Sequence, residues 1–583
     1  MNVRSIWIYR RLILIILTPL VLLPLPLAIR TKVAECAFTL LVMAVYWLTE
    51  ALPVSVTALI PAMFFPLFGI MKSSEVAAVF FKDFHLLLTG VICLATAIEK
   101  WGLHRRIALG LITIVGVNPG RLMLGSMIGC AFLSMWLSNT SAVAMVMPIV
   151  EAVIKQMITA EGEATDQRKR ALTGTSNQGL QLDGYVEPQP EEKVDITIEK
   201  SAPQTECSAP DSEASEVPAQ GYYRTRQDHM MCKGLSLCIA YSASIGGMTT
   251  LPGTSSNLIF AEYMRRYYPG CNSINFGNWF IFCIPISIIV LLLAWIWLHL
   301  LYLGTDFRSV LRSKAAYTEK EVSVAKVLRE QYNALGPISR QEIVTLVIFF
   351  VMVSLWFTRE PGFMPGWSAL FPDYVGYASD ATVALLLGLL FFIIPAQRTK
   401  DSYDSLITWK DFQSCMPWEI CLLVGGGFAL AEGTQVSGLS TWVANLLVPL
   451  GELPPVATIT IVCVIVTSVT EVASNAATMT IFLPILGPMA ESIHVNPLYM
   501  LIPATLCVSF SFLLPSANPP NAIVFSYGHL TTLDMVKAGL GVNVIGVLAV
   551  LLGTMTYGMP LFNLDEYPDW APIHPSSNSS LPN

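Results

Sequence analysis

The sequence predicts an all-α polytopic membrane protein with about eleven transmembrane helices, two inverted repeats, two re-entrant hairpins and broken helices at the substrate site. Three observations support this fold class. The 583 residues are 54% hydrophobic and only 13% charged, a composition unlike that of a soluble globular protein. Apolar stretches of spanning length recur along the chain. One segment, from Gly90 to Ile149, reappears 336 residues later.

The apolar stretches come close to the length of about 17 to 25 residues that a helix needs to cross a bilayer. In chain order they are Leu12 to Ile29, Cys36 to Ala51, Val54 to Met71, Leu122 to Leu137, Gly234 to Thr250, Phe280 to Tyr302, Ile343 to Phe357, Ala381 to Ile394, Ala457 to Val472, Pro497 to Leu514 and Ala538 to Met559. The first stretch could instead be a cleaved signal peptide, because basic residues precede it. It is long for a signal peptide, contains three prolines and lacks a small-x-small cleavage site, so we expect a span.

Polar segments divide the chain into units. The stretch between Ile158 and Cys232 is rich in Gln, Glu, Ser, Pro and Thr, which predicts a disordered loop. The predicted units are residues 1–154, the first repeat with N-terminal spans and the first hairpin; 155–232, a disordered cytoplasmic loop; 233–303, the remainder of the first repeat; 304–342, a basic cytoplasmic linker; 343–560, the second repeat with the second hairpin; and 561–583, an extracellular tail.

The placement of basic residues predicts the orientation. Three arginines precede the first span, and seven Lys and Arg residues lie between Arg308 and Arg340. By the positive-inside rule both segments face the cytoplasm, and an odd number of spans then puts the C-terminus outside. Asn578 begins the glycosylation sequon Asn578-Ser579-Ser580 in that tail. We expect it to be glycosylated; the alternative is an unmodified tail.

The internal duplication puts a polar break at the same place in each copy. A shift of 336 residues superposes Ser134 on Thr470, Ser138-Asn139 on Ser474-Asn475 and Pro148-Ile149 on Pro484-Ile485. Many secondary transporters build their substrate site from a duplicated membrane unit with a broken helix in each copy. The duplication therefore favours transport.

A second pair of elements repeats at a different offset. Gly253 to Asn257 matches Ala517 to Asn521 at 264 residues, and Pro519-Pro520 suits the start of a helix. The two offsets differ by 72 residues, close to the length of the polar loop. The loop is therefore interpreted as an insertion in the first repeat.

The residue types at the breaks suit ion binding. A helix broken within the bilayer survives only where it is buried against protein or lines a polar site. Ser and Asn side chains stabilise the turn and offer oxygens to a hard cation such as sodium, while the N-terminus of the next half-helix favours an anion. The alternative is that Ser-Asn merely packs helices together.

Other features allow two interpretations each. We expect re-entrant hairpins near Asp83 to Glu99 and Glu419 to Gln435, and the triple glycine Gly425 to Gly427 suits such a turn, although close helix packing would also explain it. The acidic residues at membrane depth, Glu50, Glu151 and Glu471, are candidate functional groups. Their alternative is a capping or interface role.

Catalytic and metal-site motifs are missing from the sequence. It has no HExxH, GxSxG or Walker A motif, and its twelve cysteines are scattered without a CxxC pair. We therefore expect neither an enzyme nor a protein that uses an organic cofactor or binds nucleic acid. A passive anion channel remains an alternative.

Four motifs resemble those of the divalent anion/sodium symporters, solute carrier family 13. They are Trp47 to Pro53, Phe132 to Thr140, Tyr241 to Gly247 and Asn518 to Phe525, and the resemblance covers nearly the whole chain outside the polar loop. It implies a sodium-coupled symporter that works as a homodimer in the lipid bilayer. It also implies the apical plasma membrane of epithelia.

The resemblance assigns roles to residues at the breaks. The first co-transported sodium would be held by Ser134, Ser138, Asn139 and Gly253, and the second by Thr470, Ala473, Asn475 and Ala517. Substrate would lie between them, contacted by Asn139, Thr140, Thr254, Ser474, Asn475, Asn518 and Pro519. Gly253 and the alanines would contribute their carbonyl oxygens.

Two positions bear on the substrate. Dicarboxylate members of the family tend to have Thr where this chain has Asn518, which favours sulfate. The sulfate branch usually has Pro where this chain has Ala476, which is a departure from that branch. The resemblance therefore implies import of sulfate and related oxyanions, with a sodium/dicarboxylate cotransporter as the alternative.

Overall fold

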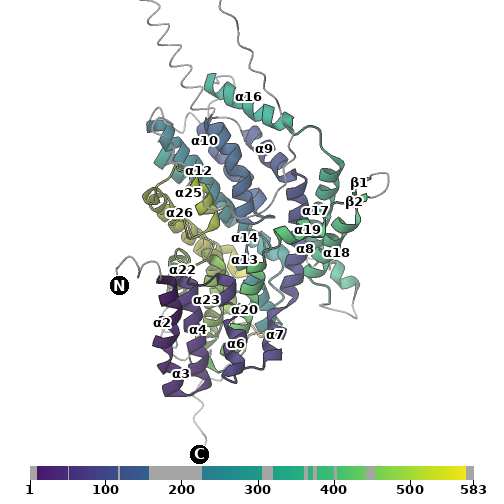
Figure 1. Cartoon of the computed structure of the whole chain (residues 1–583). Helices are drawn as coiled ribbons and strands as arrows, with labels where there is room; N and C mark the ends of the chain where they lie inside the picture. The colour runs from purple at the N-terminus through teal and green to yellow at the C-terminus, as the bar shows by residue number, and fades with distance from the viewer. Residues whose placement is uncertain are drawn as a thin grey trace, which may run out of the picture.

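Helices dominate the structure, and many of them run along the long axis of the view in Figure 1. The computed structural model describes residues 10–49, 51–115, 118–155, 226–304, 319–359, 366–371, 377–398, 403–439, 442 and 454–572. Among these residues, six helices are long and apolar enough to cross a membrane, or seven if one pair bent by 59° is a single span. The described residues thus fit a polytopic protein, and the count of about eleven spans stays a prediction.

The N-terminal helices pack around a pair of apolar hairpin arms. They are α2 (Arg10–Leu22), α3 (Pro24–Ile29), α4 (Lys32–Thr49), α5 (Val54–Thr57), α6 (Ile60–Leu67), α7 (Ser73–Phe80), α8 (Asp83–Lys100) and α9 (Leu103–Val115). Apolar side chains such as Leu12, Ile16 and Leu20 are exposed on α2, as suits a surface that faces lipid. The Tyr46 hydroxyl donates to the Ile15 carbonyl at 2.6 Å, which joins α4 to the first apolar run.

Two later sets of helices follow one pattern. The first set is α10 (Pro119–Ser134), a helix over residues 139–155, α12 (Arg226–Gly247), α13 (Ser255–Tyr267), α14 (Phe276–Leu298) and the π-helix η1 (His299–Leu303). The second is α22 (Pro455–Thr470), α23 (Asn475–Ser492), α24 (Pro497–Cys507), α25 (Pro519–Ser526), α26 (Thr532–Gly553), the π-helix η6 (Thr554–Gly558) and α27 (Met559–Phe562). Every residue of α24 is buried, as is nearly all of α12.

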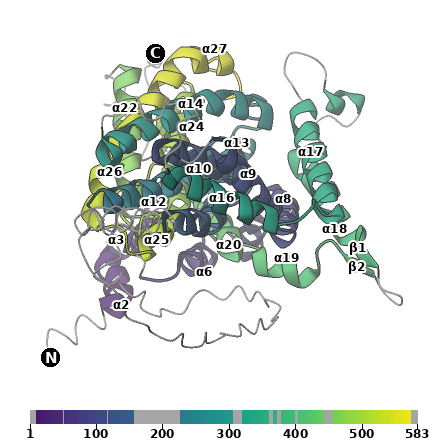
Figure 2. The same cartoon turned by 90° about the horizontal axis from the view of Figure 1, so that it is seen from above.

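Between the two sets lies a flank of shorter elements, which Figure 2 shows beside the main body. It comprises α16 (Glu319–Ala334), α17 (Arg340–Arg359), the 3-10 helix η3 (Trp367–Leu370), α18 (Asp380–Ile393), β1 (Pro395–Arg398), β2 (Tyr403–Ser405), α19 (Trp409–Cys415) and α20 (Trp418–Val436). The two strands pair antiparallel, with a bulge after Pro395. This small hairpin is an addition to the predicted all-α fold.

Each set begins with a helical hairpin whose two arms return to the same side of its break. In the first set, the outer end of α10 contacts α14 through Gly120 O and Trp295 Nε1 (2.9 Å). The outer end of the other arm contacts His529 through Glu151 (2.7 Å). In the second set, both α22 and α23 pack against α24. Because α10 and α22 have 16 residues each, they are roughly 24 Å long, shorter than the bilayer core of about 30 Å.

The two hairpins point in opposite directions, as inverted repeats require. Helices α10 and α12 lie at the end of the molecule that carries α16, and the described chain ends on the opposite side (Figure 1). The second hairpin reaches that opposite side, because Glu491 at the end of α23 accepts from the Tyr268 hydroxyl (2.5 Å). The Tyr268 ring in turn meets Trp570, with 5.3 Å between ring centroids.

The predicted position of the re-entrant hairpins was wrong. The segments near Asp83 to Glu99 and Glu419 to Gln435 are the continuous helices α8 and α20, whereas the stretches predicted as spans at 122–137 and 457–472 are hairpin arms. The triple glycine serves close packing. A Cβ at Gly425 would collide with Phe80, one at Gly426 with Ala58 and one at Gly427 with Thr480.

The predicted loop 155–232 is too long at its C-terminal end. Residues from Arg226 onward belong to α12, where Asp228, Met231 and Cys232 are buried. A loop would leave these side chains exposed, and their burial holds the segment in the helix. Residues 156–225 lie outside the described residues, as do Glu50 and Asn578.

Candidate functional site

The first break brings together three of the four residues predicted to hold the first cation. Ser134 Oγ donates to Asn139 Oδ1 at 2.6 Å. A Cβ at Gly247 would collide with the Asn139 amide, and one at Gly253 would collide with the Gly247 carbonyl. The absence of side chains at both glycines therefore lets the second element, residues 248–254, lie directly against the hairpin tip.

Short polar side chains cap the helices that leave this break. Ser138 Oγ donates to Ser141 Oγ (2.9 Å) and accepts from Ser141 N (3.1 Å). Thr254 Oγ1 accepts from Asn257 N (3.3 Å) at the start of α13. Ser138 and Thr140 are exposed. The Ser138 hydroxyl thus acts as a cap here, and its contact with a cation stays a prediction.

The second break repeats the arrangement of the first. Thr470 Oγ1 lies 2.9 Å from Asn475 Oδ1 and 3.0 Å from Val508 O; its single hydrogen serves one of them at a time. Ser474 Oγ accepts from Ala477 N (3.3 Å). Ala473 and Ala517 are buried, so only their backbone groups can serve a ligand.

A matched asparagine brackets the second element of each repeat. Asn257 Nδ2 donates to Met248 O (3.1 Å) and Thr250 O (2.8 Å). Asn521 Nδ2 donates to Ser511 O (2.8 Å) and Leu514 O (2.9 Å). Both asparagines are fully buried. They fix the carbonyls of the interrupted helices, which would otherwise lack partners.

The two breaks are joined to each other near the centre of the molecule. Asn518 Nδ2 donates to Ser244 Oγ at 3.0 Å, and the Tyr241 hydroxyl donates to Phe512 O at 3.3 Å. Helix α13 also packs against α23 and α24. Ser244 was missing from the predicted site, although it lies within one of the four family motifs.

Four helices begin at the breaks. They are the helix over residues 139–155, α13, α23 and α25, with Pro519 in the first turn of α25. Each N-terminus carries roughly half a positive elementary charge. The break segments themselves, residues 135–138, 248–254, 471–474 and 508–518, contain no Lys or Arg. An anion here would therefore be met by helix ends and neutral donors.

Two of the acidic candidates have defined surroundings. Glu471 Oε1 accepts from Phe512 N (3.0 Å) and Asn543 Nδ2 (2.6 Å), and its Oε2 accepts from Leu513 N (2.9 Å). Glu151 pairs with His529 and Lys155 at the outer end of the first hairpin. Glu471 thus belongs to the second break, whereas Glu151 joins structural elements away from it.

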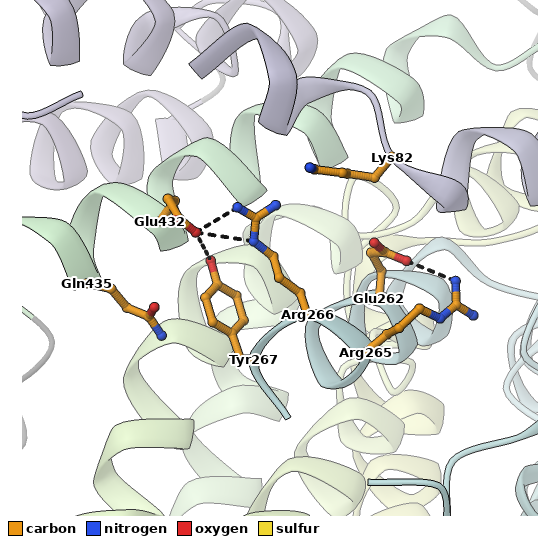
Figure 3. A pocket seen from close by; sticks show the side chains of 7 residues that line it. All are labelled: Lys82, Glu262, Arg265, Arg266, Tyr267, Glu432 and Gln435. Carbon is orange, nitrogen blue, oxygen red and sulfur yellow. Dashed lines mark hydrogen bonds and ion pairs between the residues drawn. The ribbon is translucent and has the colours of Figure 1, made fainter. Parts of the chain in front are cut away.

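A separate charged cavity of about 410 Å³ lies where the end of α13 meets α8 and α20 (Figure 3). Its lining residues are Lys82, Glu262, Arg265, Arg266, Tyr267, Glu432 and Gln435. Arg266 Nη2 pairs with Glu432 Oε2 at 2.7 Å, and Arg265 pairs with both Glu262 and Asp83. The cavity is roughly 18 Å along α13 from the break, so it is distinct from the candidate site.

Inverted repeats whose hairpin tips and broken helices meet inside the protein define a secondary transporter. The chain belongs to the sodium:sulfate symporter family: the family model described as "Sodium:sulfate symporter transmembrane region" matches residues 4–564. This finding confirms the resemblance of the motifs.

Several curated proteins match along their whole length. Solute carrier family 13 member 1 of Rattus norvegicus is 56% identical, with 97% of this chain and 98% of the relative covered. The Homo sapiens protein of the same name is 55% identical, with 99% of each chain covered. The Na(+)/dicarboxylate cotransporter 3 of Homo sapiens is 39% identical, with 99% of this chain and 97% of the relative covered.

Proposed function

We propose that this protein is a sodium-coupled symporter that imports sulfate and related oxyanions across the plasma membrane. The observation that carries the proposal is the repeated oxygen pair, Ser134 with Asn139 and Thr470 with Asn475. Broken helices with such polar oxygens coordinate sodium in secondary transporters. Sodium binding would replace the hydrogen that each pair now shares.

The proposed ligand sets follow the two breaks. Ser134, Ser138, Asn139 and Gly253 hold one sodium, and Thr470, Ala473, Asn475 and Ala517 hold the other. Sulfate lies between them against Asn139, Thr140, Thr254, Ser474, Asn475, Asn518 and Pro519. The bond between Asn518 and Ser244 supports this placement, because it brings a residue of each repeat to the same point.

Charge balance sets the binding order. Sulfate carries two negative charges, and the break segments offer no Lys or Arg. Helix N-termini supply only partial charges, so bound sodium provides the field that the anion requires. Sodium therefore binds first, and sulfate should bind poorly in sodium-free medium. Tight sulfate binding without sodium would contradict this order.

A dicarboxylate is the second candidate substrate. The presence of Ala476 and the similarity to a Na(+)/dicarboxylate cotransporter favour it. Sulfate is preferred because the family model is described by sodium and sulfate. In addition, relatives whose names specify dicarboxylate match at 39% identity, below the 55–56% of the solute carrier family 13 member 1 proteins.

The proposed setting is a homodimer in the apical membrane of epithelia, with the N-terminus in the cytoplasm and a glycosylated Asn578 outside. The positions of α16 and the last described residues, at opposite ends of Figure 1, are consistent with this orientation. Transport would proceed by movement of the unit that carries both breaks against the surrounding helices.

Radiolabelled sulfate uptake in cells that express the chain tests the proposal. Uptake should be saturable, disappear when choline replaces sodium, and fall with selenate or thiosulfate but not with succinate. Cells expressing an Asn139→Ala variant at equal surface abundance provide the background. Sodium-dependent succinate uptake in place of sulfate uptake would select the second candidate, and sodium-independent flux down a gradient would indicate a channel.

A further inference from the structure

The second repeat carries oxygen atoms at four buried positions where the first repeat carries none in its side chains. At the offset of 336 residues Glu471 matches Met135, and at the offset of 264 Ser509, Ser511 and Asn543 match Ile245, Gly247 and Trp279. The four polar residues are 5% exposed or less. All four replacements therefore add polarity to the interior of one repeat only.

These residues gather in one place, behind the second break. Glu471 contacts Asn543 through its Oε1 atom (2.6 Å) and the backbone of Phe512 (3.0 Å). Asn521 Nδ2 contacts the carbonyl of Ser511, the residue before Phe512, at 2.8 Å. A continuous chain of contacts thus links the carboxylate to Asn543, Ser511 and Asn521.

The cluster has more acceptors than donors. Within the described part of the chain, four oxygens of the cluster have no hydrogen-bond partner: Ser509 Oγ, Ser511 Oγ, Asn521 Oδ1 and Asn543 Oδ1. Of their first-repeat counterparts, Ile245, Gly247 and Trp279 have no side-chain oxygen, and only Asn257 has an oxygen without a partner. Buried oxygens without donors are costly, which indicates a ligand that accepts electron pairs.

The charge of the cluster points the same way. Among the described residues no Lys, Arg or His forms an ion pair with Glu471, whereas buried Glu342 pairs with Arg106 and buried Asp380 with Arg359. A buried carboxylate without a cationic side chain is expected to bind a cation. The described residues contain no group of three His, Cys, Asp or Glu side chains, so the chemistry favours a hard ion held by oxygens.

We propose that Glu471, Ser509, Ser511, Asn521 and Asn543 form a third cation site, for sodium, that has no counterpart in the first repeat. The site deepens the proposed function and rests on it. One carboxylate balances one monovalent cation, and the neutral oxygens complete its shell. Three sodium ions moving with one divalent anion carry one net positive charge per cycle, whereas two would carry none.

The ratio of sodium to sulfate flux in proteoliposomes, together with the sulfate-induced current, tests the third site. The wild type should move three sodium ions per sulfate and produce an inward current. Glu471→Gln should lower the ratio to two and abolish the current. Ser511→Ala should raise the sodium concentration for half-maximal uptake roughly fivefold.

Ser511→Ala keeps the test decisive if Glu471→Gln does not fold, because the Ser511 hydroxyl has no partner to lose. Its matched control is Ser236→Ala in α12, which removes another fully buried hydroxyl without a hydrogen-bond partner, about three turns from the first break. A wild-type ratio of two without current, or a Ser511→Ala variant that behaves as the control, would overturn the third site. Absence of sodium-dependent sulfate uptake in the wild type would instead overturn the proposed function.

Discussion

The two breaks share one frame but are fastened by different chemistry. In the first, the Thr250 hydroxyl donates to the Met135 carbonyl at 2.5 Å. In the second, the backbone N–H groups of Phe512 and Leu513 donate to the Glu471 carboxylate. In both cases the broken helix donates and the hairpin tip accepts. The comparison teaches that the duplication preserved the oxygen pairs and the geometry, while the fastening of each tip diverged.

The half-helices that leave the breaks differ in the same way. Arg265 at the end of α13 matches His529 after α25 at the offset of 264 residues. Arg265 and Arg266 pair with Asp83 and Glu432 on the surrounding helices α8 and α20. His529 instead bonds Glu151 in the first hairpin. Of these two matched ends, only that of α13 is tied by ion pairs to the surrounding helices.

The largest expected effect comes from removing either matched amide. Asn139→Ala and Asn475→Ala should each reduce sodium-dependent sulfate uptake to the background measured in choline. Each substitution removes an oxygen of one proposed sodium site and a contact to the substrate, so neither repeat can compensate for the other. Uptake is compared at equal surface abundance, measured by biotinylation.

Ser236→Ala, away from the breaks, is the control for this pair and should transport normally. Substantial uptake by one of the two asparagine variants would show that the repeats contribute unequally to ion binding. That result would break the equivalence of the two oxygen pairs while leaving the fold comparison intact.

The site was predictable where its contacts are local and repeated. Ser134 and Asn139 lie five residues apart, as do Thr470 and Asn475, so the repeat alone placed both pairs. The contact between Ser244 and Asn518 spans 274 residues, and no spacing in the sequence indicates it. The partners of Glu471 escaped prediction for the same reason, since two of them are backbone groups.

The fold was predictable as a class and less so in its parts. Hydropathy identifies an apolar helix but does not tell a span from a hairpin arm. That distinction depends on length and on the packing of α10 and α22 against buried neighbours. Glycines misled the placement of the hairpins, because Gly425 to Gly427 serve contacts with Phe80, Ala58 and Thr480 that only the folded chain reveals.

A smaller effect, on stability, should separate the two fastenings. Thr250→Val removes one neutral hydrogen bond and should lower the free energy of unfolding by about 1 kcal/mol. Glu471→Gln weakens bonds from three donors to a charged group and should lower it by about 1.5–3 kcal/mol. The midpoint of thermal unfolding in detergent, measured without sodium, ranks the two variants.

Thr556→Val, at an exposed position on η6, controls for the loss of a hydroxyl alone. Equal shifts for Thr250→Val and Glu471→Gln would mean that the carboxylate stabilises the second break no better than a hydroxyl stabilises the first. The difference between the fastenings would then concern ion binding only.

The smallest expected effect lies at the end of α13. The Arg266 and Glu432 side chains are 18% and 28% exposed, so water and salt screen their attraction, and the pair contributes at most about 1 kcal/mol. If the pair forms in only one state of the transport cycle, Glu432→Gln shifts the balance of states by no more than about fivefold. The apparent affinity for sulfate should change within that limit, while the sodium requirement stays.

Gln435→Ala is the matched control for Glu432→Gln, because both residues line the same cavity and only Glu432 carries a charge. The difference between the two variants should shrink as ionic strength rises, since the pair is partly exposed. A change that persists at high salt would assign the role of Glu432 to packing with Tyr267. The tie between α13 and the surrounding helices would then be mechanical, and the contrast with His529 would be one of shape instead of charge.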